Sequence, residues 1–457
     1  MTALEVPEVA KELGERFAAA GYSLYVVGGF VRDLILGRFA EDGDIDFATD
    51  ATPAESVKVL RGWADRHYLV GATFGTVGAR KGGRLLEITT FREEIYREDD
   101  RKPVVTFSKE IETDLSRRDF TINAMAVSVP DGAFVDPFGG VKHLAAKVLD
   151  TPREPETAFT DDPLRMLRAA RFVSQLGVVP APRVLEAIVR MRSRLAIVSA
   201  ERIADELDKL LLGEGPGKGL EVVVGSGLAE EFLPELPALA LEQDPVHKHK
   251  DVLRHTYAVV ERCEPDRELR LAGLLHDIGK PATREITPEG VQFHHHEVVG
   301  ARMARERLHA LRYPGHVIDD VGTLIELHLR FHGYGEGWSD SAVRRYVRDA
   351  GPLLDKLNQL TRADVTTRNP DRAKKFQALQ DDLEERIARL AEEENLQALR
   401  PDLDGNEIMA HLGIAPGPLV GEAWNFLMEL RLDRGPLERE EALRALDEWA
   451  KERGIGE

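Results

Sequence analysis

Apolar and polar positions follow two different periods in the first 140 residues of the chain. Short runs with a period of two, typical of strands that bury one face, interrupt stretches with apolar residues three to four positions apart, typical of helices. This pattern predicts helices over 6–20 and from about Val31, and strands over 25–27, 45–47, 76–79, 85–89 and 123–129. The N-terminal part is therefore predicted to carry a sheet of its own.

After Thr160 the pattern becomes helical and stays so to the end of the chain. Clusters of Gly and Pro interrupt it at 212–219, 241–250, 334–340 and 400–405. An α+β fold is predicted, in which a small mixed-sheet head precedes a long all-α neck, body and tail, with strands in the head alone. The predicted parts are a head (1–145), a neck (146–245), a body (246–375) and a tail (376–457).

Composition narrows the class of protein. A length of 457 residues exceeds what one core holds, and 43% hydrophobic residues is normal for a globular chain. With 61 basic and 80 acidic residues the net charge is −19, which argues against extended coating of nucleic acid and confines any RNA contact to local basic patches. The single cysteine, Cys263, excludes an internal disulfide and a cysteine-based zinc site. No apolar run approaches the roughly 20 residues of a membrane span, so we expect a cytoplasmic protein without a membrane partner.

A glycine pair and two acidic residues are the candidate chemistry of the head. Asp44 and Asp46 stand two apart in a predicted strand, so their side chains leave on the same face. Carboxylates are the ligands that Mg²⁺ prefers, and two such ions can promote transfer of a phosphoryl group. Gly28 and Gly29 precede a helix that carries Arg32, an arrangement suited to a triphosphate. Taken singly, these motifs are more often a solvated acidic turn and a plain strand-to-helix turn.

The order of these motifs resembles the DNA polymerase β-type nucleotidyltransferase superfamily. In that superfamily a third carboxylate follows on a later strand, and Glu87 occupies this place; the alternative is an acidic residue at the surface of a strand. Four further segments resemble bacterial class II tRNA nucleotidyltransferases, which add CCA to tRNA 3′ ends. These are FREEIYREDDRKPVVTF (91–107), SRRDFTINAMA (116–126), DDPLRMLRAARF (161–172) and ERIADELDKLL (201–211).

This resemblance implies the residues that bind the incoming nucleotide. Arg118 and Asp119 are expected beside its ribose and phosphates, with Asn123 supporting the site. The alternative is a charged turn whose side chains bond locally. The implied reaction is attack of the tRNA 3′-hydroxyl on the α-phosphate of CTP or ATP, with two Mg²⁺ held by Asp44 and Asp46 and pyrophosphate leaving.

The base is expected to be chosen in the neck. On one helix, Asp162 and Arg165 would be neighbours, with Arg168 continuing the row. Cytosine and adenine share an amino group beside an acceptor nitrogen, so a carboxylate next to a guanidinium can bind either base. The family's template is commonly Glu-Asp-x-x-Arg, and this chain has DDPLR, with Asp161 in place of the glutamate. An isolated Asp/Arg pair at this spacing is ordinarily a surface salt bridge.

The body contains a second candidate metal site. LLHDIGKP (274–281) resembles the HD superfamily of phosphohydrolases, which implies a divalent ion of undefined identity. The implied ligands are His255, His276, Asp277 and Asp364, with His296 and His328 as additional ligands or as contacts to phosphate. Adjacent helical residues diverge by about 100°, so His276 and Asp277 can share an ion only at a bend or between helices. A buried core histidine is the alternative for any one of them.

Three functions remain open at this stage. The first is a CCA-adding enzyme whose partners are the tRNA 3′ end, CTP and ATP, with an additional HD phosphohydrolase activity open. The second is a poly(A) polymerase or A-adding enzyme of the same family. The third is an HD phosphohydrolase whose head has become an RNA-binding module. The segment 404–431 resembles the tRNA-binding tail of the CCA-adding enzymes, and a small helical interaction domain is its alternative.

Overall fold

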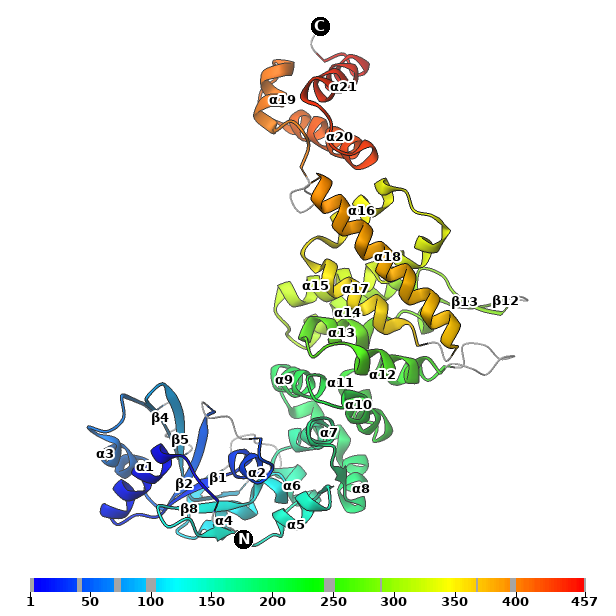
Figure 1. Cartoon of the computed structure of the whole chain (residues 1–457). Helices are drawn as coiled ribbons and strands as arrows, with labels where there is room; N and C mark the ends of the chain where they lie inside the picture. Colours follow the sequence, from blue (N-terminus) through cyan, green and yellow to red (C-terminus); the bar gives the residue numbers. More distant parts are fainter. Residues whose placement is uncertain are drawn as a thin grey trace. The chain divides into compact units, whose positions relative to one another are not determined.

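The computed structural model describes residues 4–38, 43–69, 75–95, 104–241, 251–287, 290–366, 369–394 and 400–455. Part of the segment 91–107, which resembles the family, lies outside the described residues. The chain forms two compact units, Met1–Pro237 and Ala238–Glu457 (Figure 1). The predicted α+β class is confirmed, with the main sheet in the first unit and long helices in both.

A seven-stranded mixed sheet organises the first unit, in the order β3-β4-β5-β2-β1-β8-β9. Strands β2 and β5 are parallel, and the other neighbours are antiparallel. The strands are β1 (Leu24–Val27), β2 (Ile45–Thr49), β3 (Arg66–Tyr68), β4 (Thr76–Lys81), β5 (Arg84–Thr90), β8 (Ala126–Val129) and β9 (Phe134–Val135). Strands β6 (Arg92–Ile95) and β7 (Val104–Phe107) form a separate pair within the segment 91–107.

One face of the sheet is fully covered, whereas the other, which carries Asp46, is covered in part by a second hydrophobic cluster that includes Ile111 and Leu115. Ile45 and Phe47 of β2 are buried, whereas Asp46 between them is exposed, as a period of two requires. The covered face packs against residues of α1 and α3, among them Leu13 and Leu60. The helices of this part are α1 (Glu8–Ala19), α2 (Gly29–Ile35), α3 (Pro53–Leu60), α4 (Ile111–Ser116) and α5 (Gly140–Ala145).

Six helices follow in the same unit and include the predicted neck. They are α6 (Pro155–Asp161), α7 (Leu164–Leu176), α8 (Pro182–Met191), α9 (Ala200–Leu211), α10 (Pro216–Gly225) and α11 (Ala229–Phe232). Helix α7 packs against α9 and α10, and ten of its residues are buried, which makes it the centre of this layer. A two-stranded parallel pair, β10 (Val148–Leu149) and β11 (Val179–Pro180), closes the loop around α6 and α7.

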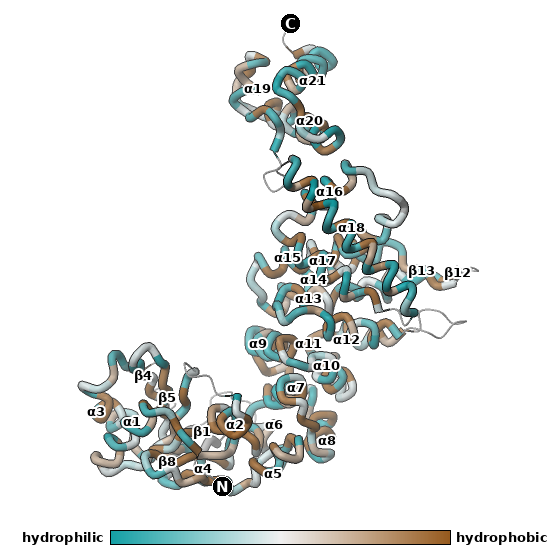
Figure 2. The backbone as a smooth tube through the Cα atoms, viewed as in Figure 1, coloured by the Kyte–Doolittle hydropathy of each residue, from teal (hydrophilic) through white to brown (hydrophobic). Residues whose placement is uncertain are grey.

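The second unit is mainly helical. Its helices are α12 (Val252–Arg262), α13 (Arg267–Leu275), α14 (His296–Ala310), α15 (Gly315–Leu327), α16 (Asp340–Ala350), α17 (Leu354–Asp364), α18 (Pro370–Glu394), α19 (Gly405–Leu412), α20 (Pro418–Arg434) and α21 (Arg439–Glu452). Helices α19 to α21 share a small core of their own. Helix α18 is long but mostly hydrophilic (Figure 2), and none of the described helices meets the length and hydropathy of a membrane span.

Three local expectations were wrong. Strands also occur outside the head, because β10–β11 and the hairpin β12 (Arg284–Thr287) and β13 (Gly290–Phe293) lie beyond residue 145. Asn123 belongs to a 3-10 turn over Thr121–Asn123, and β8 begins only at Ala126. Asp162 and Arg165 do not share a helix: Asp162 is extended, with φ −145° and ψ 103°, and α7 begins after Pro163. A proline disfavours helical geometry in the residue before it, which explains the break between α6 and α7.

Candidate active site and metal centre

The predicted head carboxylates meet on the face of the sheet opposite α1 and α3. Asp46 of β2 pairs in register with Glu87 of the parallel strand β5, so their side chains leave the sheet side by side. Asp44 precedes β2 and lies close enough for its charge to act on both. Desolvation raises the pKa of Asp46, with Arg118 opposing and Asp44 reinforcing the shift. Desolvation and the charges of Asp46 and Asp44 raise the pKa of Glu87. This excess of negative charge favours a bound cation.

Gly28 brings the backbone close to these groups. Its φ of 73° is a left-handed conformation that favours glycine. A Cβ atom at this position would lie 3.0 Å from Arg118 Nη1 and 3.6 Å from Asp46 Oδ2. Gly29 opens α2, and a Cβ there would lie 3.4 Å from Arg32 Nη2. The glycine pair thus leaves room for a guanidinium and a carboxylate against the chain.

A buried polar network connects α2, the 3-10 turn and α7. Arg32 Nη1 donates to Asn123 Oδ1 at 2.8 Å, and Asn123 Nδ2 donates to Asp119 Oδ1 at 3.0 Å. Arg168 donates to Asp119 Oδ2 through Nε at 3.0 Å and through Nη2. Burial alone would raise the pKa of Asp119, but Arg168 and Asn123 hold it well below its usual range. The carboxylate is therefore ionised and its oxygens already accept hydrogen bonds from the protein.

Arg118 is held by a residue that the sequence analysis did not identify. Asp114 in α4 is fully buried and accepts from Arg117 Nη2 at 2.6 Å and from Arg118 Nη2 at 3.1 Å. Despite its burial, these two guanidinium groups lower the pKa of Asp114. The spacings i, i+3 and i, i+4 within TDLSRR carry the signal that could have identified it.

The proposed base-reading residues have different partners. Asp162 Oδ2 accepts from Arg202 Nη2 of α9 at 2.7 Å, and Asp162 Oδ1 accepts from the Leu164 amide at 3.2 Å. Arg165 is buried and donates through Nη2 to the Arg117 carbonyl at 2.7 Å. Because Pro163 ends the helix between them, Asp162 and Arg165 do not form the expected side-chain pair. Arg202 was missed, since it pairs across 40 residues.

Helix α9 supplies a second missed carboxylate. Glu206 is buried and lies 3.6 Å from Arg168 Nη1 and 3.0 Å from Arg171 Nη1. Arg171 also lies over the Phe172 ring, 4.3 Å from its centroid, and so packs within the neck. Desolvation, together with the charge of Arg168, lowers the pKa of Arg171 to about 10. The side chains of Arg168, Arg171 and Glu206 together fix the direction of α7 relative to α9.

The HD residues converge in the second unit. His276 and Asp277 lie in the turn that follows α13, which is the bend needed for both to face one ion. His255 Nε2 lies 3.3 Å from His276 Nε2 and 2.9 Å from Asp364 Oδ1. Asp277 Oδ2 lies 3.6 Å from His255 Nε2 and 3.3 Å from His276 Nε2. Lys280 Nζ donates to the same oxygen at 2.7 Å.

His296 and His328 face Asp277 from the other side. Asp277 Oδ1 lies 3.4 Å from His296 Nε2, and Asp277, His296 and His328 form a second group of potential ligands within 4.8 Å of one another. Each histidine is oriented by its Nδ1: His296 through the Phe293 carbonyl at 2.9 Å and His328 through the Ile325 carbonyl at 2.6 Å. Burial, with the charge of His276, lowers the pKa of His328 to about 3, so its ring is neutral. Imidazoles fixed in this way present Nε2 as a ligand atom.

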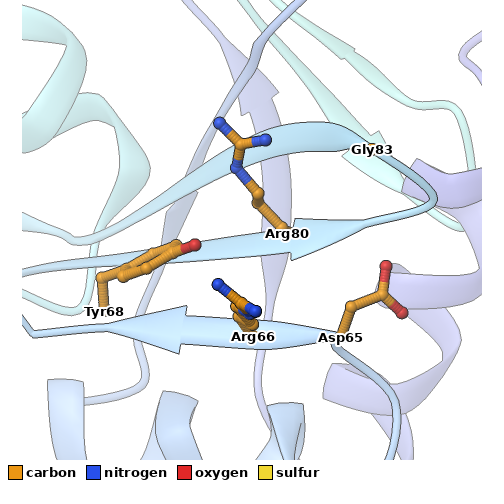
Figure 3. Close-up of a pocket in the computed structure, with 5 residues that line it drawn as sticks. All are labelled: Asp65, Arg66, Tyr68, Arg80 and Gly83. Carbon is orange, nitrogen blue, oxygen red and sulfur yellow. The ribbon is translucent and has the colours of Figure 1, made fainter.

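An open hollow on the head is separate from these clusters. It has a volume of about 420 Å³ and lies at the β3–β4 edge of the sheet (Figure 3). Its lining consists of Asp65, Arg66, Tyr68, Arg80 and Gly83. None of the predicted catalytic or nucleotide-binding residues is among them. The hollow is therefore an additional feature of the head surface.

Three family models match successive parts of the chain. They are described as the poly A polymerase head domain (24–150), the probable RNA and SrmB- binding site of polymerase A (177–239) and the HD domain (251–394). The fold and the site thus define a nucleotidyltransferase of the poly(A) polymerase head type that carries an HD domain. More particularly, the chain is similar to the CCA-adding enzymes in both sequence and fold.

Individual relatives carry this similarity. The chain is 36% identical to a CCA-adding enzyme of Geobacillus stearothermophilus over 306 residues, which is 67% of this chain and 66% of that one. It is 43% identical to the CCA-adding enzyme of Bacillus subtilis over 214 residues, 47% of this chain and 52% of that one. The sequence matches thus span between half and 66% of these relatives' lengths.

Solved structures extend the similarity to the whole chain. The CCA-adding enzyme of Bacillus stearothermophilus in complex with CTP matches with a TM-score of 0.72 and 27% identity, covering 98% of this chain and 99% of that one. The Thermotoga maritima CCA-adding enzyme complexed with tRNA matches with a TM-score of 0.61 at 19% identity, covering 98% of this chain and 96% of that one; this match supports the fold.

Proposed function

We propose that this chain adds C, C and A to the 3′ end of tRNA from CTP and ATP, without a nucleic-acid template. The observation that carries the proposal is the carboxylate pair Asp46 and Glu87 beside Arg118 and Gly28, in a chain whose fold matches a CTP-bound CCA-adding enzyme along its length. The poly(A) polymerase reading is disfavoured because the curated relatives above are CCA-adding enzymes. We place the activity in the cytoplasm.

The head carboxylates fit a pair of Mg²⁺ ions. Asp44, Asp46 and Glu87 offer hard oxygen ligands, and burial, together with repulsion between the carboxylates, raises the pKa values of Asp46 and Glu87, an effect that a bound cation would offset. Bound there, Mg²⁺ would activate the attacking hydroxyl and neutralise the leaving phosphate. Arg118 is directed by Asp114 toward the space beside Gly28, where it would bind phosphate oxygens. Arg32 and Asn123 hold this region through the network that ends at Asp119 and Arg168.

Base selection is assigned to Asp162, Arg165 and Arg168. The Asp162 carboxylate can accept hydrogen bonds, and Arg168 lies close enough for its positive charge to interact with that carboxylate. Cytosine and adenine would donate a hydrogen bond from their amino group to that carboxylate. Guanine and uracil would place a carbonyl there instead, so two acceptors would face each other. Arg202 now pairs with Asp162, so a base must exchange with that guanidinium to reach the carboxylate. We also retain the four-part division into head (1–145), neck (146–245), HD body (246–375) and tRNA-binding tail (376–457).

A second activity is proposed for the HD body because four buried or half-buried ligands converge there. His255, His276, Asp277 and Asp364 fit a divalent ion, which would supply Lewis-acid activation for hydrolysis of a phosphate ester. The orientation of His255 by Thr366, through Nδ1 at 2.7 Å, leaves its Nε2 directed at the cluster. This activity does not depend on the head.

The decisive assay uses tRNA truncated before its CCA. We expect two C residues with CTP alone and a complete CCA with CTP and ATP. A long A tail, or no addition with both nucleotides, would contradict the proposal. Asp44→Ala is expected to abolish addition of every nucleotide, whereas Asp162→Ala is expected to retain addition and to reduce discrimination against GTP and UTP. Phosphate release from simple esters by the Asp44→Ala variant tests the HD activity independently.

A further inference from the structure

One row of paired residues runs from the candidate active site to the edge strand β3 of the head sheet. Asp46 pairs with Glu87, Glu87 with Gly78, and Gly78 with Tyr68. Residues paired in register leave a sheet on the same face, and three strand spacings of about 4.8 Å place Tyr68 about 14 Å from Asp46. The hollow of Figure 3, which Tyr68 lines, therefore opens on the face that carries the candidate active site.

The part of this face between Glu87 and the edge is open within the described part of the chain. The hydrophobic cluster that covers the face in part contains residues of β1, β2, β8 and α4, and none of β3 or β4. Glu87 on β5 and Arg80 on β4 are exposed, and Gly78 between the strands' ends is half-buried. A ligand that extends from Glu87 toward β3 thus meets no covering element among the described residues.

The glycine in this row brings the Tyr68 side chain against β4. A Cβ atom at Gly78 would lie 3.6 Å from Tyr68 Cδ2 and 3.7 Å from Tyr68 Cβ, which is ordinary van der Waals contact. The ring therefore rests on the strand next to β5. Its side chain is still 37% exposed and offers a surface on which a base or a ribose can pack.

Two arginines stand beside this ring. Arg66 and Arg80 are directly opposed on β3 and β4, both are exposed, and neither has an ion pair within the described residues. Like charges directly opposed across two strands destabilise a sheet, so a bound anion would offset their repulsion. Asp65, the acidic residue among those that line the hollow, accepts from the Gly82 amide at 2.7 Å. The hollow therefore has an excess of positive charge, in a chain whose net charge is −19.

The proposed phosphate-binding groups indicate from which side of Asp46 an RNA strand arrives. Gly28 follows β1, and its Cβ would lie 3.0 Å from Arg118 Nη1, so these groups lie on the β1 side of β2. Strand β5, with Glu87, lies on the other side of β2. In phosphoryl transfer the attacking and leaving oxygens lie roughly in line on opposite sides of the phosphorus. A pyrophosphate held at Gly28 and Arg118 therefore requires the attacking hydroxyl to come from the β5 side, where the row leads to Tyr68.

We propose that the edge formed by Arg66, Tyr68 and Arg80 binds the RNA strand whose 3′-hydroxyl is being extended, a few nucleotides before its end. The two guanidinium groups bind backbone phosphates, and the Tyr68 ring packs against a base or ribose. Neither contact reads the edge of a base, so both tolerate the change of sequence as C, C and A are added. This inference rests on the proposed CCA addition and adds the path of the RNA strand over the head.

Arg66→Ala with Arg80→Ala tests the phosphate contacts. Two phosphate contacts to a single strand contribute about −1.4 to the slope of log affinity against log salt. The variant should therefore bind tRNA that lacks its CCA more weakly than the parent does, with a deficit that shrinks about sevenfold between about 50 and about 200 mM salt. The KM for CTP should be unchanged. A raised KM for CTP with an unaltered affinity for tRNA would show that the edge binds the incoming nucleotide, and would overturn the proposal.

Tyr68 has its own pair of variants. Tyr68→Ala removes the ring and should weaken tRNA binding about fivefold or more, at low and high salt alike, because stacking is not an ionic contact. Tyr68→Phe keeps the ring and should bind tRNA as the parent does. Equal affinities of Tyr68→Ala and the parent would refute packing of the RNA on this ring, and this pair decides the question should the arginine double variant fail to fold.

The matched control for the arginine pair is Lys58→Ala with Arg61→Ala. These two exposed cations lie at the end of α3, on the opposite face of the sheet. Their removal should leave the affinity for tRNA and its salt slope unaltered, and equal salt slopes of the two double variants would refute a phosphate contact at the β3–β4 edge. Absence of CCA addition by the unmodified chain would instead refute the proposed function.

Discussion

Replacing Asp119 with asparagine removes the negative charge that connects the head to α7. Asp119 is 8% exposed and accepts from the Phe120 amide at 2.8 Å, from Asn123 at 3.0 Å and from two nitrogens of Arg168. The side chain of Arg168 is 29% exposed, so solvent replaces little of the lost interaction. Breaking such a buried pair costs about 3–5 kcal/mol. Because Glu206 lies 3.6 Å from the same guanidinium, we expect the lower value of about 3 kcal/mol.

The loss should depend on pH in a defined direction. The folded protein holds the pKa of Asp119 below the value of about 3.9 for an unfolded aspartate. The charged form is therefore favoured by folding, and its contribution is present above about pH 4 and disappears as the pH falls through the folded pKa. The difference between the two proteins in free energy of unfolding should be full at pH 7 and should shrink below pH 4.

Urea unfolding followed by hydrogen–deuterium exchange of peptides from β2 and α7 reports the first unit separately from the second. Asp205→Asn makes the same chemical change at an exposed position of α9 and should cost no more than about 0.5 kcal/mol. The reasoning would be refuted by equal stabilities of Asp119→Asn and Asp205→Asn at pH 7. It would also be refuted by a deficit that persists unchanged at pH 3.

Three further predictions concern single positions. Asp46→Asn should abolish nucleotide addition while leaving the free energy of unfolding equal or higher, because the raised pKa of Asp46 shows that folding disfavours its charge; a marked loss of stability in urea would contradict this. Gly28→Ala should raise the KM for CTP, since its Cβ would lie 3.0 Å from Arg118 Nη1. The control is Gly37→Ala, where φ is a similar 65° and no atom lies within 4 Å of the added Cβ; it should destabilise the protein to a similar extent without raising the KM. Cys263 should resist iodoacetamide at pH 8 until the protein unfolds, because burial raises the pKa of its thiol to about 12; rapid labelling of the native chain would show this to be wrong.

The parts of the site that depend on strand periodicity were predictable. Asp46 and Glu87 stand in alternating apolar strands, and alternation alone decides which face they leave. The sequence does not specify which strand lies next to which, so the registered pairing of these two residues required the sheet order. For every site residue, its role in binding a nucleotide or a metal stays a prediction.

The parts that depend on distant partners could not be predicted. Arg202 reaches Asp162 across 40 residues, and Glu206 reaches Arg171 across 35, with no local spacing to indicate either. The break at Pro163 is different, because its signal was present in DDPLR and was outweighed by the apolar period on both sides. The hairpin β12–β13 is short and its residues are exposed or half-buried, so it has little of the apolar alternation that marks the head strands.

The break at Pro163 changes how base selection has to work. On a continuous helix, Asp162 and Arg165 would have formed a rigid pair set by helical geometry alone. Instead, Asp162 is positioned by its bond to the Leu164 amide and by Arg202 of α9, and Arg165 by the Arg117 carbonyl. The relative position of the two groups therefore depends on contacts from three segments. Arg202→Ala should consequently alter the discrimination between CTP and UTP while leaving the rate of pyrophosphate release with saturating CTP nearly unchanged. Equal loss of rate with all nucleotides would show that Arg202 acts on the stability of α7 instead.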